Sequence, residues 1–388
     1  MHGVASRATV RCSISQQIST WSGHCRSQRR PARPVPIAEY FKIGQTNLKI
    51  YSAHPHDILL KMKQIKNLSQ LDLGESLWSQ SSRLVAPLFR WAGGKQRFLW
   101  DHRNRLPNFE GRYFEPFAGG LSVYFHYVRT SQTPFKAVIG DVNLRLIRCY
   151  KEVFVDPDGV ADRLTSLEAG YVAAEDKANF FYDVREQHNL MSPRADAARF
   201  IFLMAAGWNG VYRTNQKGGF NVPHGAPKSL KLPTRETLNA VATVFATADI
   251  RARSWEATIN TARRGDFVFL DPPYGGSSRQ DLYERSNQFL VEDQVKLAKA
   301  LLELQDRGVD FLLTNSADEV TKAIYSDLGL NVSIVGALRS VSRVVESRAV
   351  DSEIIVTPNL RAAEHRQEDL LSELRLRSMK QGGKKSDH

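Results

Sequence analysis

The succession of strand and helix patterns between residues 113 and 154 constrains the fold of this chain most. Residues 113–117 (YFEPF) have the pattern of a short strand, and the turn AGG and an apolar helix over 121–128 follow it. A second strand is predicted over 137–141, with an amphipathic helix over 143–154 after it. Strands that alternate with helices indicate a parallel sheet, because two parallel strands need a crossover connection. We therefore expect an α/β fold.

The rest of the chain continues this pattern after an interruption. Residues 156–200 look helical and polar, and residues 205–231, rich in Gly, Asn, Pro and basic residues, indicate loops or a hairpin. Strands are predicted over 266–270, 310–313 and 352–356, and a helix over 291–305. The predicted parts are an N-terminal extension over 1–83, a main α/β domain over 84–155 and 250–360, an insertion over 156–249 and a polar tail over 361–388.

The composition excludes several broad classes of protein. With 42% hydrophobic and 24% charged residues, the chain resembles an ordinary globular protein. Its longest apolar run, around 200–208, is far shorter than the roughly 18 residues of a membrane span. The three cysteines, Cys12, Cys25 and Cys149, have the spacing of neither a zinc site nor a disulfide framework. Since no secretory signal is recognisable, we expect a cytoplasmic protein. The short apolar runs and the spacing of the cysteines predict neither a membrane span nor a bound metal.

The net charge of +12 suggests an anionic partner, but most of this charge lies near the two ends of the chain. Residues 1–84 hold twelve Lys and Arg against four Asp and Glu, and residues 361–388 hold seven against five. The chain between them is close to neutral. A nucleic-acid surface there must therefore come from local clusters of basic side chains.

Residues 1–38 contain six Arg, no Lys and no acidic residue, with a Pro-rich stretch at 31–36. Such a segment buries little apolar surface, so we expect it to be disordered. Three interpretations stay open: a basic arm on nucleic acid, a transit peptide, or an inert segment from a gene start assigned too early. Short helices are expected over 57–70 and 364–376.

The most informative motif is DPPY, which directly follows the predicted strand over 266–270 and consists of Asp271, Pro272, Pro273 and Tyr274. In doubly wound sheets, ligands bind beyond the carboxyl ends of the strands. The Asp271 carboxylate and the Pro272 carbonyl can accept both hydrogens of an amine, and Tyr274 offers a face on which a base can stack. The alternative is a Pro turn that ends a strand, with Asp271 as a cap.

A Gly-rich turn lies between the first predicted strand and its helix, in the block EPFAGG that runs from Glu115 through Phe117 and Gly119. Glycines let backbone amides approach a ligand. Asp141 ends the next strand, about 20 residues past the turn, which suits an acid that binds ribose hydroxyls. The full dinucleotide fingerprint G-x-G-x-x-G is absent, so the turn alone is also compatible with a tight strand-to-helix connection.

Two further blocks carry aromatic and basic side chains. RWAGGK, with Arg90, Trp91 and Lys95, offers an aromatic plane, a small-residue turn and a cation that can meet a ligand carboxylate. The alternative is a core tryptophan and a solvated lysine. The second block runs over 207–224 (GWNGVYRTNQKGGFNVPH), where aromatic, amide and basic residues alternate with glycines. That mixture suits base edges and phosphates, although an ordinary polar hairpin has a similar composition.

These four blocks, in their order along the chain, resemble the Dam-type (D12 class) family of DNA adenine N6-methyltransferases. The family pattern runs W-A-G-G-K, P-F-x-G, D-x-N, N-G-x-x-R-x-N…F-N-V-P and D-P-P-Y, and the similarity covers about residues 84–358. It includes residues 289–294 and the block LTNS over 313–316, whereas the leading 84 residues have no counterpart. Leu121 stands where some members have another glycine. Val211, Tyr212, Thr214 and Gly219 differ from the best-known members, so the recognised DNA sequence does not carry over.

The resemblance implies a Rossmann-like methyltransferase sheet with an inserted helical and hairpin DNA-recognition domain. The implied cofactor is S-adenosylmethionine, and the residues expected to bind it are Trp91, Lys95, Glu115, Phe117, Gly119, Asp141 and Asp271. The implied catalytic motif is Asp271 to Tyr274. The residues expected to contact DNA are Arg90, Trp208, Asn209, Arg213 and Asn221.

We therefore expect a site-specific enzyme that methylates N6 of an adenine flipped out of double-stranded DNA and that lies near the nucleoid. A cognate restriction endonuclease is a candidate partner. One alternative is a cytosine N4-methyltransferase, which faces the same amine chemistry. Another is a DNA-binding homologue that has lost activity. No cysteine lies in the Pro-Cys context that cytosine C5 chemistry needs.

Overall fold

The computed structural model describes residues 39–43, 46–50, 75–187, 192–274, 289–338 and 350–359. For residues 39–43, 46–50, 75, 337–338 and 350–351 it describes the backbone alone. The expected disorder over 1–38 and the expected helices over 57–70 and 364–376 lie outside the described residues. The chain divides into two compact units, residues 1–63 and residues 64–388. In the first unit, β1 (Glu39–Ile43) pairs antiparallel with β2 (Thr46–Ile50).

Within the described residues, the second unit contains a seven-stranded sheet with the order β5-β4-β3-β6-β7-β9-β8. Neighbouring strands from β5 to β7 are parallel, whereas β9 is antiparallel to both β7 and β8. The strands are β3 (Tyr113–Glu115), β4 (Ala137–Asp141), β5 (Ala248–Ala252), β6 (Phe267–Leu270), β7 (Asp310–Ser316), β8 (Asn331–Leu338) and β9 (Val350–Thr357). The predicted α/β class is confirmed.

At β3 the sheet begins to grow on its other side. The chain goes from β3 outward to β4 and β5, and then returns to the other side of β3 with β6 and β7. At such a switch point the helices that follow neighbouring strands lie on opposite faces, which leaves a crevice at the carboxyl ends of the strands. The fold therefore places any ligand near the ends of β3, β4 and β6.

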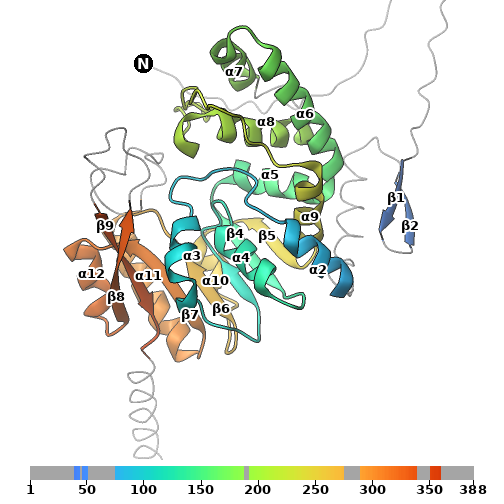
Figure 1. Cartoon of the computed structure of the whole chain (residues 1–388). Coiled ribbons are helices and arrows are strands. Elements are labelled where there is room, and N and C mark those ends of the chain that lie inside the picture. The colour runs from blue at the N-terminus through green and yellow to red at the C-terminus, as the bar shows by residue number, and fades with distance from the viewer. Residues whose placement is uncertain are drawn as a thin grey trace, which may run out of the picture. The chain divides into compact units, whose positions relative to one another are not determined.

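Helices cover both faces of the sheet (Figure 1). α10 (Trp255–Ile259), α11 (Val291–Asp306) and α12 (Glu319–Ser326) pack on one face, against Phe114, Val268 and the residues that point the same way. The other face, which includes Tyr113 and Phe267, is covered by α2 (Glu75–Leu84), α3 (Gln96–His102), α4 (Ser122–Thr130) and α5 (Leu144–Val155). Neighbouring strand residues point to opposite faces, so each strand contributes to both cores.

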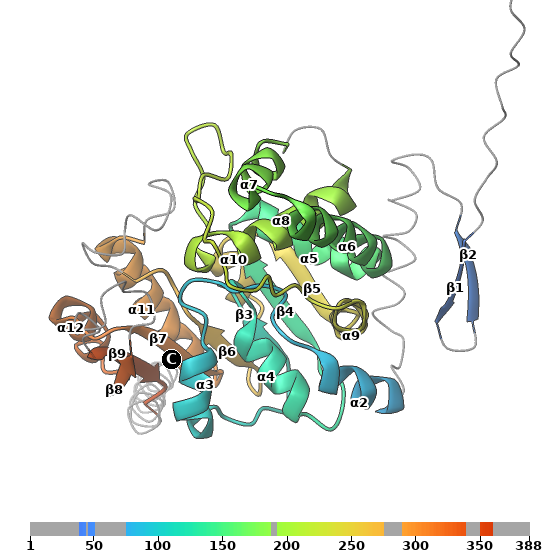
Figure 2. The same cartoon turned by 45° about the horizontal axis from the view of Figure 1, so that its top comes forward.

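The first three helices of the predicted insertion lie together at one end of this unit, and the fourth lies beside α2 (Figures 1 and 2). All four have local start signals. They are α6 (Pro157–Ala173), α7 (Lys177–Glu186), α8 (Pro193–Ala206) and α9 (Arg235–Phe245). Local signals set their starts: Asp156 caps α6 ahead of Pro157, and Asp176 and Thr234 cap α7 and α9. α8 packs on both α5 and α6, so these helices share a core with the sheet. The division into a catalytic domain and a recognition domain stays a prediction.

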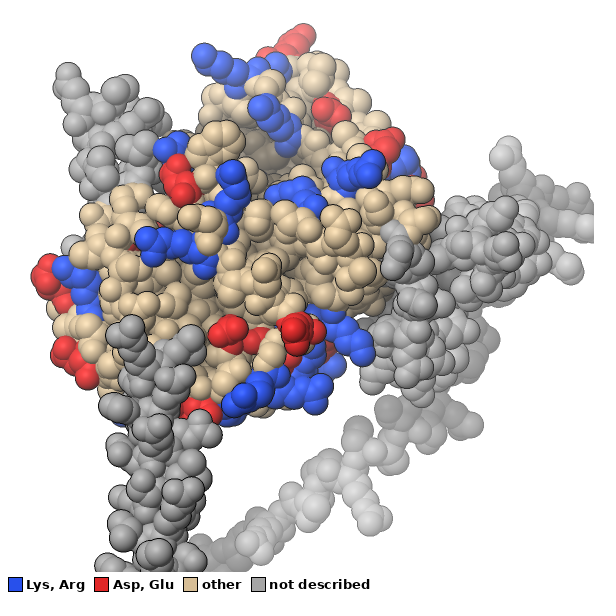
Figure 3. Space-filling model, turned by 60° about the horizontal axis from the view of Figure 1, so that its bottom comes forward, with Lys and Arg blue, Asp and Glu red and all other residues tan. Residues whose placement is uncertain are grey.

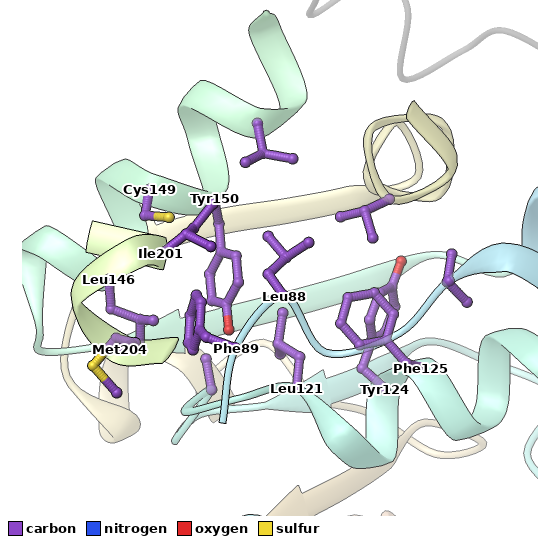
Figure 4. Packing of buried hydrophobic residues seen from close by; sticks show 14 of the residues in the cluster. Leu88, Phe89, Leu121, Tyr124, Phe125, Leu146, Cys149, Tyr150, Ile201 and Met204 are labelled. Atoms are coloured by element: carbon purple, nitrogen blue, oxygen red, sulfur yellow. The ribbon is translucent and has the colours of Figure 1, made fainter. Parts of the chain in front are cut away.

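The predicted extension over 1–83 ends inside the second unit, because α2 belongs to this unit. Trp78 of α2 is fully buried, its ring lies edge-on to Phe135 at 5.6 Å, and its indole N–H donates to the Ser131 carbonyl. After α2 the chain enters the core. Figure 4 shows Leu88 and Phe89 packed among side chains of α4, α5 and α8. This buried segment fixes the start of the RWAGGK block.

Candidate active site

Asp271 follows the last residue of β6, at the switch-point edge of the sheet. Its Oδ2 accepts a hydrogen bond from Lys95 Nζ at 2.6 Å, and its Oδ1 accepts one from Thr314 Oγ1 at 2.9 Å. Lys95 also donates to the Gly93 carbonyl at 2.9 Å. The Lys95 side chain is 7% exposed and that of Asp271 is 21% exposed. The structure thus joins residues 176 positions apart into one partly open cluster.

The other residues of the DPPY motif line the same edge. Pro272 is buried, whereas Pro273 and Tyr274 are partly exposed. The Lys95 ammonium lies 5.3 Å from the centre of the Tyr274 ring. An amine donor therefore already lies between the Asp271 carboxylate and the Tyr274 ring, which is the place expected for a substrate amine.

Glu115 ends β3 and is buried, and its Oε2 accepts a hydrogen bond from the Tyr113 hydroxyl at 2.7 Å. Burial raises the pKa of the Glu115 carboxyl to about 8, and the nearby Asp271 carboxylate acts in the same direction. Hydrogen bonds from Tyr113 and from the Tyr124 backbone oppose this shift. Glu115 is therefore largely protonated at neutral pH.

Asp141 ends β4, and two backbone amides bind its carboxylate: Gly119 N–H at 3.2 Å and Asn143 N–H at 2.8 Å. Burial raises the pKa of the Asp141 carboxyl to about 6 although both amides lower it. The carboxylate is thus tied to the Gly-rich turn. The expected grouping of Asp141 with Gly119 is present in the structure.

The glycines of the turn make room for Trp91. A Cβ on Gly119 would lie 3.1 Å from the Trp91 ring, and one on Gly120 would lie 3.1 Å from Trp91 Cβ. Leu121, where some family members have glycine, adopts a left-handed φ of 55°. A non-glycine residue is strained in that region, so the departure noted in the sequence carries a backbone cost.

Phe117, which follows the strand, lies edge-on to Phe289 at 5.8 Å. Phe289 lies two residues before α11, so this contact brings the start of α11 close to the Gly-rich turn. Phe117 is only partly buried and remains accessible at the edge of the sheet.

The RWAGGK block also contacts the segment over 207–224. The Trp91 ring stacks on Tyr212 at 5.8 Å with an interplanar angle of 17°, and Ala92 N–H donates to the Gly210 carbonyl at 3.0 Å. A Cβ on Gly210 would lie 2.8 Å from Arg90 Cγ and from the Arg90 carbonyl. Gly210 has φ +65° and is required by this close approach.

The segment over 207–224 forms a hairpin-like loop, as expected. Antiparallel bridges join Gly207 with His224 and Thr214 with Phe220. The exposed Arg213 donates from Nε to Asn221 Oδ1 at 2.8 Å, which orients its guanidinium. At the base of the loop, the Tyr171 hydroxyl of α6 lies 2.8 Å from His224 Nε2. We call residues 207–224 the hairpin from here on.

Comparison with known proteins identifies the family. The family model described as D12 class N6 adenine-specific DNA methyltransferase matches residues 91–341. The chain belongs to this family. It is 31% identical over 282 residues to the Type II methyltransferase M1.LlaDCHI of Lactococcus lactis, which covers 70% of this chain and 95% of the relative. The predicted adenine-specific DNA methyltransferase is therefore confirmed over the cytosine N4 alternative.

Two other relatives show the same extent of similarity. The Type II methyltransferase M.MjaIII of Methanocaldococcus jannaschii is 32% identical over 272 residues, 66% of this chain and 93% of the relative. The DNA adenine methylase of Escherichia coli K12 is 31% identical over 257 residues, 65% of this chain and 88% of the relative. In all three comparisons the chain spans most of the relative.

The predicted site residues of this methyltransferase fall into two groups. Trp91, Lys95, Glu115, Gly119, Asp141 and Asp271 lie at or next to the ends of β3, β4 and β6. Among the predicted DNA residues, Arg90 and Arg213 are exposed, whereas Trp208, Asn209 and Asn221 are partly buried. Asn209 adopts a left-handed φ of 53° in η2 (Trp208–Gly210).

The sequence did not predict a role for Thr314, Tyr113, Tyr150 or Tyr212. Thr314 binds Asp271, Tyr113 binds Glu115, and the Tyr150 hydroxyl donates to the Gly119 carbonyl at 2.5 Å. Only Thr314 had a signal, since it lies in the LTNS block that the family shares. Tyr113 and Tyr150 look like core aromatics in the sequence, and Tyr212 was noted only as a departure from the family pattern.

In the part of the chain that the structure describes, no cluster of His, Cys, Asp or Glu has the arrangement of a metal site. No helix among the described residues is long and apolar enough to cross a membrane. On the face shown in Figure 3, Lys and Arg side chains lie both above and below a broad uncharged band, with Asp and Glu side chains among them.

Proposed function

We propose that this methyltransferase uses S-adenosylmethionine to methylate N6 of an adenine that is flipped out of double-stranded DNA. The edge formed by β3, β4 and β6 would hold the cofactor and the base, and the hairpin would contact the DNA around the target. The observation that carries this proposal is the Asp271 cluster, in which a carboxylate at the end of β6 lies beside an amine and an aromatic ring.

The residues of the cofactor edge fit the chemistry of S-adenosylmethionine, which carries an ammonium, a carboxylate and ribose hydroxyls. Asp141 lies at the end of β4, where an acid binds ribose hydroxyls in related sheets. Glu115 is a buried acid close to Asp271 and Lys95, and a cationic ligand group there would favour its ionised form. Trp91 and Phe117 would supply apolar walls, and Gly119 keeps the turn thin.

S-adenosylmethionine supplies an electrophilic methyl group on a sulfonium centre. Asp271 Oδ2 would accept one hydrogen of the adenine amine in the place where it now accepts from Lys95, and the Pro272 carbonyl would accept the other. These two acceptors aim the N6 lone pair at the methyl carbon. Asp271 would also take the proton that the amine gives up on methylation. Orientation of this kind supplies much of the rate.

Tyr274 would stack on the flipped base. The face of its ring is open to a ligand group, because the Lys95 ammonium lies over it. Stacking on an aromatic side chain contributes roughly 1–3 kcal/mol per base and offsets part of the cost of flipping. Lys95 has to yield its place on Asp271 when the amine arrives, and a cofactor carboxylate is its predicted new partner.

The hairpin and the RWAGGK block would form the DNA surface, with Arg90, Trp208, Asn209, Arg213 and Asn221. Arg213 is exposed and held by Asn221, which suits a side chain that reads a base edge. The stacking of Trp91 on Tyr212 would link this surface to the cofactor edge. A nucleoid location follows from the DNA substrate. The Type II methyltransferase names of two relatives favour a cognate restriction endonuclease as partner.

The test uses the purified full chain, unmethylated duplex DNA and S-adenosylmethionine with an isotopically labelled methyl group. The expected product after digestion to nucleosides is labelled N6-methyladenine, formed on duplex DNA of a limited set of sequences. Labelled N4-methylcytosine would contradict the proposed base. Tight binding of both DNA and cofactor without any product would instead indicate a DNA-binding homologue that has lost activity.

A further inference from the structure

Thr314 contacts Asp271 from the strand beside it. In the parallel pair of β6 and β7, Leu270 lies opposite Leu313, so the next residues, Asp271 and Thr314, are neighbours. Thr314 is fully buried, and its hydroxyl donates to Asp271 Oδ1 at 2.9 Å and lies 3.5 Å from the Leu270 carbonyl. The hydroxyl thus lies at the base of the candidate active site without reaching its surface.

Two donors from separate elements hold the Asp271 carboxylate. Lys95, at the start of α3, binds Oδ2, and Thr314 of β7 binds Oδ1. The terminal torsion of an aspartate is broad, so a carboxylate with one donor can rotate. A donor on each oxygen fixes its plane. When a substrate amine takes the place of Lys95 on Oδ2, Thr314 remains the donor that holds Oδ1, and the carboxylate, with about four acceptor sites, accommodates both.

The strand that carries Thr314 is itself anchored. The next residue, Asn315, is fully buried and donates from Nδ2 to Gln294 Oε1 at 2.9 Å. The same oxygen accepts the Tyr325 hydroxyl at 2.6 Å, and Asn315 Oδ1 accepts the Ser316 N–H. Gln294 lies in the first turn of α11 and Tyr325 in α12. These bonds tie the end of β7 to both helices on that face of the sheet.

We propose that Thr314 is a positioning residue for methyl transfer, which acts through its hydroxyl by fixing the orientation of the Asp271 carboxylate toward the substrate amine. The inference rests on the proposed role of Asp271. It assigns a function to the LTNS block, whose Thr314 contacts Asp271. The residues behind it, Asn315, Gln294 and Tyr325, hold the strand end in place.

The hydroxyl is tested with Thr314→Val, which keeps the shape of the side chain and removes the donor, and with Thr314→Ser, which keeps the donor. Thr314→Val should lower kcat by about 10-fold to 100-fold, since a small misplacement of a reacting group has effects of this size. The KM for DNA and for S-adenosylmethionine should stay close to wild type. Thr314→Ser should recover most of kcat.

The matched control is Thr321→Val. Thr321 is also buried, and its hydroxyl donates to the Asp318 carboxylate at 2.7 Å, but it lies in α12 away from Asp271. A similar loss of stability without a loss of kcat is expected there. If Thr314→Val does not fold, Thr314→Cys gives the same comparison, because cysteine is of similar size and its S–H is only a weak donor.

Two results would overturn the inference. One is a kcat of Thr314→Val equal to that of wild type. The other is a Thr314→Ser variant as slow as Thr314→Val, because the hydroxyl would then not be the cause. Asp271→Asn is measured alongside. If Asp271→Asn is fully active, the proposed role of Asp271 fails; if it is inactive while Thr314→Val is fully active, only the inference on Thr314 fails.

Discussion

The edge of the sheet around Asp271 and the hairpin over 207–224 are held in place by different means. At the sheet edge, the functional side chains come from strand ends far apart in the sequence, and they are buried or half-buried among one another. In the hairpin, short-range pairs such as Arg213 with Asn221 hold exposed side chains. One contact at its base, between Tyr171 and His224, ties it to α6.

This difference indicates which region serves the chemical step and which serves DNA recognition. The buried edge has a fixed geometry that the whole sheet supports, which suits a chemical step. The exposed side chains of the hairpin, such as Arg213, can change without disturbing the sheet, which suits the choice of a DNA sequence. Changes at the edge should therefore affect cofactor binding and rate, and changes in the hairpin should affect DNA binding.

The largest difference between the effects on cofactor binding and on DNA binding is expected from Asp141→Ala. The change removes a carboxylate predicted to bind two ribose hydroxyls, and hydrogen bonds to charged groups contribute about 1.5–3 kcal/mol each. The affinity for S-adenosylmethionine should fall by about 100-fold or more, while the affinity for DNA stays unchanged. Calorimetric titration measures both. Asp101→Ala, which removes an exposed ion pair with Arg97, is the control and should alter neither.

The opposite result, weaker DNA binding with unchanged cofactor binding, is expected from Arg213→Ala. Loss of a side chain that reads a base edge costs about 1–3 kcal/mol, so the affinity for cognate DNA should fall by roughly tenfold to 100-fold. Binding of S-adenosylmethionine should not change. Fluorescence anisotropy with cognate and unrelated duplexes gives the comparison. Arg235→Ala is the control, because Arg235 is paired with Asp158 and Asp162 in the same insertion. Equal losses in the two variants would argue against base reading by Arg213.

A smaller effect is expected from Tyr171→Phe, which removes the hydroxyl that contacts His224. Burial lowers the pKa of His224, so this pair is a neutral hydrogen bond at pH 7. Such a bond contributes about 0.5–1.5 kcal/mol. The variant should bind DNA a few-fold more weakly without a change in cofactor affinity. Tyr182→Phe in α7 is the control. An unchanged DNA affinity in Tyr171→Phe would show that the hairpin does not depend on this anchor.

The last effect concerns the pH dependence of stability at the buried edge. The pKa of Glu115 is raised from 4.5 to about 8, so between these values the folded protein binds more protons than the unfolded chain. Its free energy of unfolding should therefore fall as the pH rises. Asp141, with a pKa of about 6, adds to this slope only at lower pH. Denaturant unfolding at pH 6 and pH 8 should show the fall in wild type and a flatter response in Glu115→Gln. The same slope in both proteins would contradict the assignment.

The sequence predicted the central part of the sheet well. The strand over 137–141 has the predicted bounds, and β3, β6 and β7 begin within a residue of theirs, because each is a short apolar run that ends at a polar or Gly-rich turn. The edge strands β5 and β8 were not predicted. Four of the five residues of β5 are not buried, so the segment has no apolar run. α2 was assigned to the extension because, besides Trp78, its buried residues are the serines Ser81 and Ser82, which give no apolar pattern.

The contacts of the active site were harder to predict than its members. DPPY, the Gly-rich turn and Asp141 were all found as candidates, because each lies at the carboxyl end of a strand. The hydrogen bond between Thr314 and Asp271 depends on the register of β6 and β7, which cannot be derived from the sequence of either strand. The contact of Lys95 with Asp271 depends on how the buried segment before the RWAGGK block enters the core. Both are tertiary facts that local pattern cannot supply.

The most direct test of the account is single-turnover methylation by Asp271→Asn, with DNA and S-adenosylmethionine both saturating. The account predicts a rate lower than that of wild type by about 100-fold to 10,000-fold, the range supplied by groups that handle a proton at the reacting atom. The dissociation constants for DNA and cofactor should stay close to wild type. A rate equal to that of wild type would contradict the central role of Asp271, as would a loss of activity that comes entirely from weaker DNA binding.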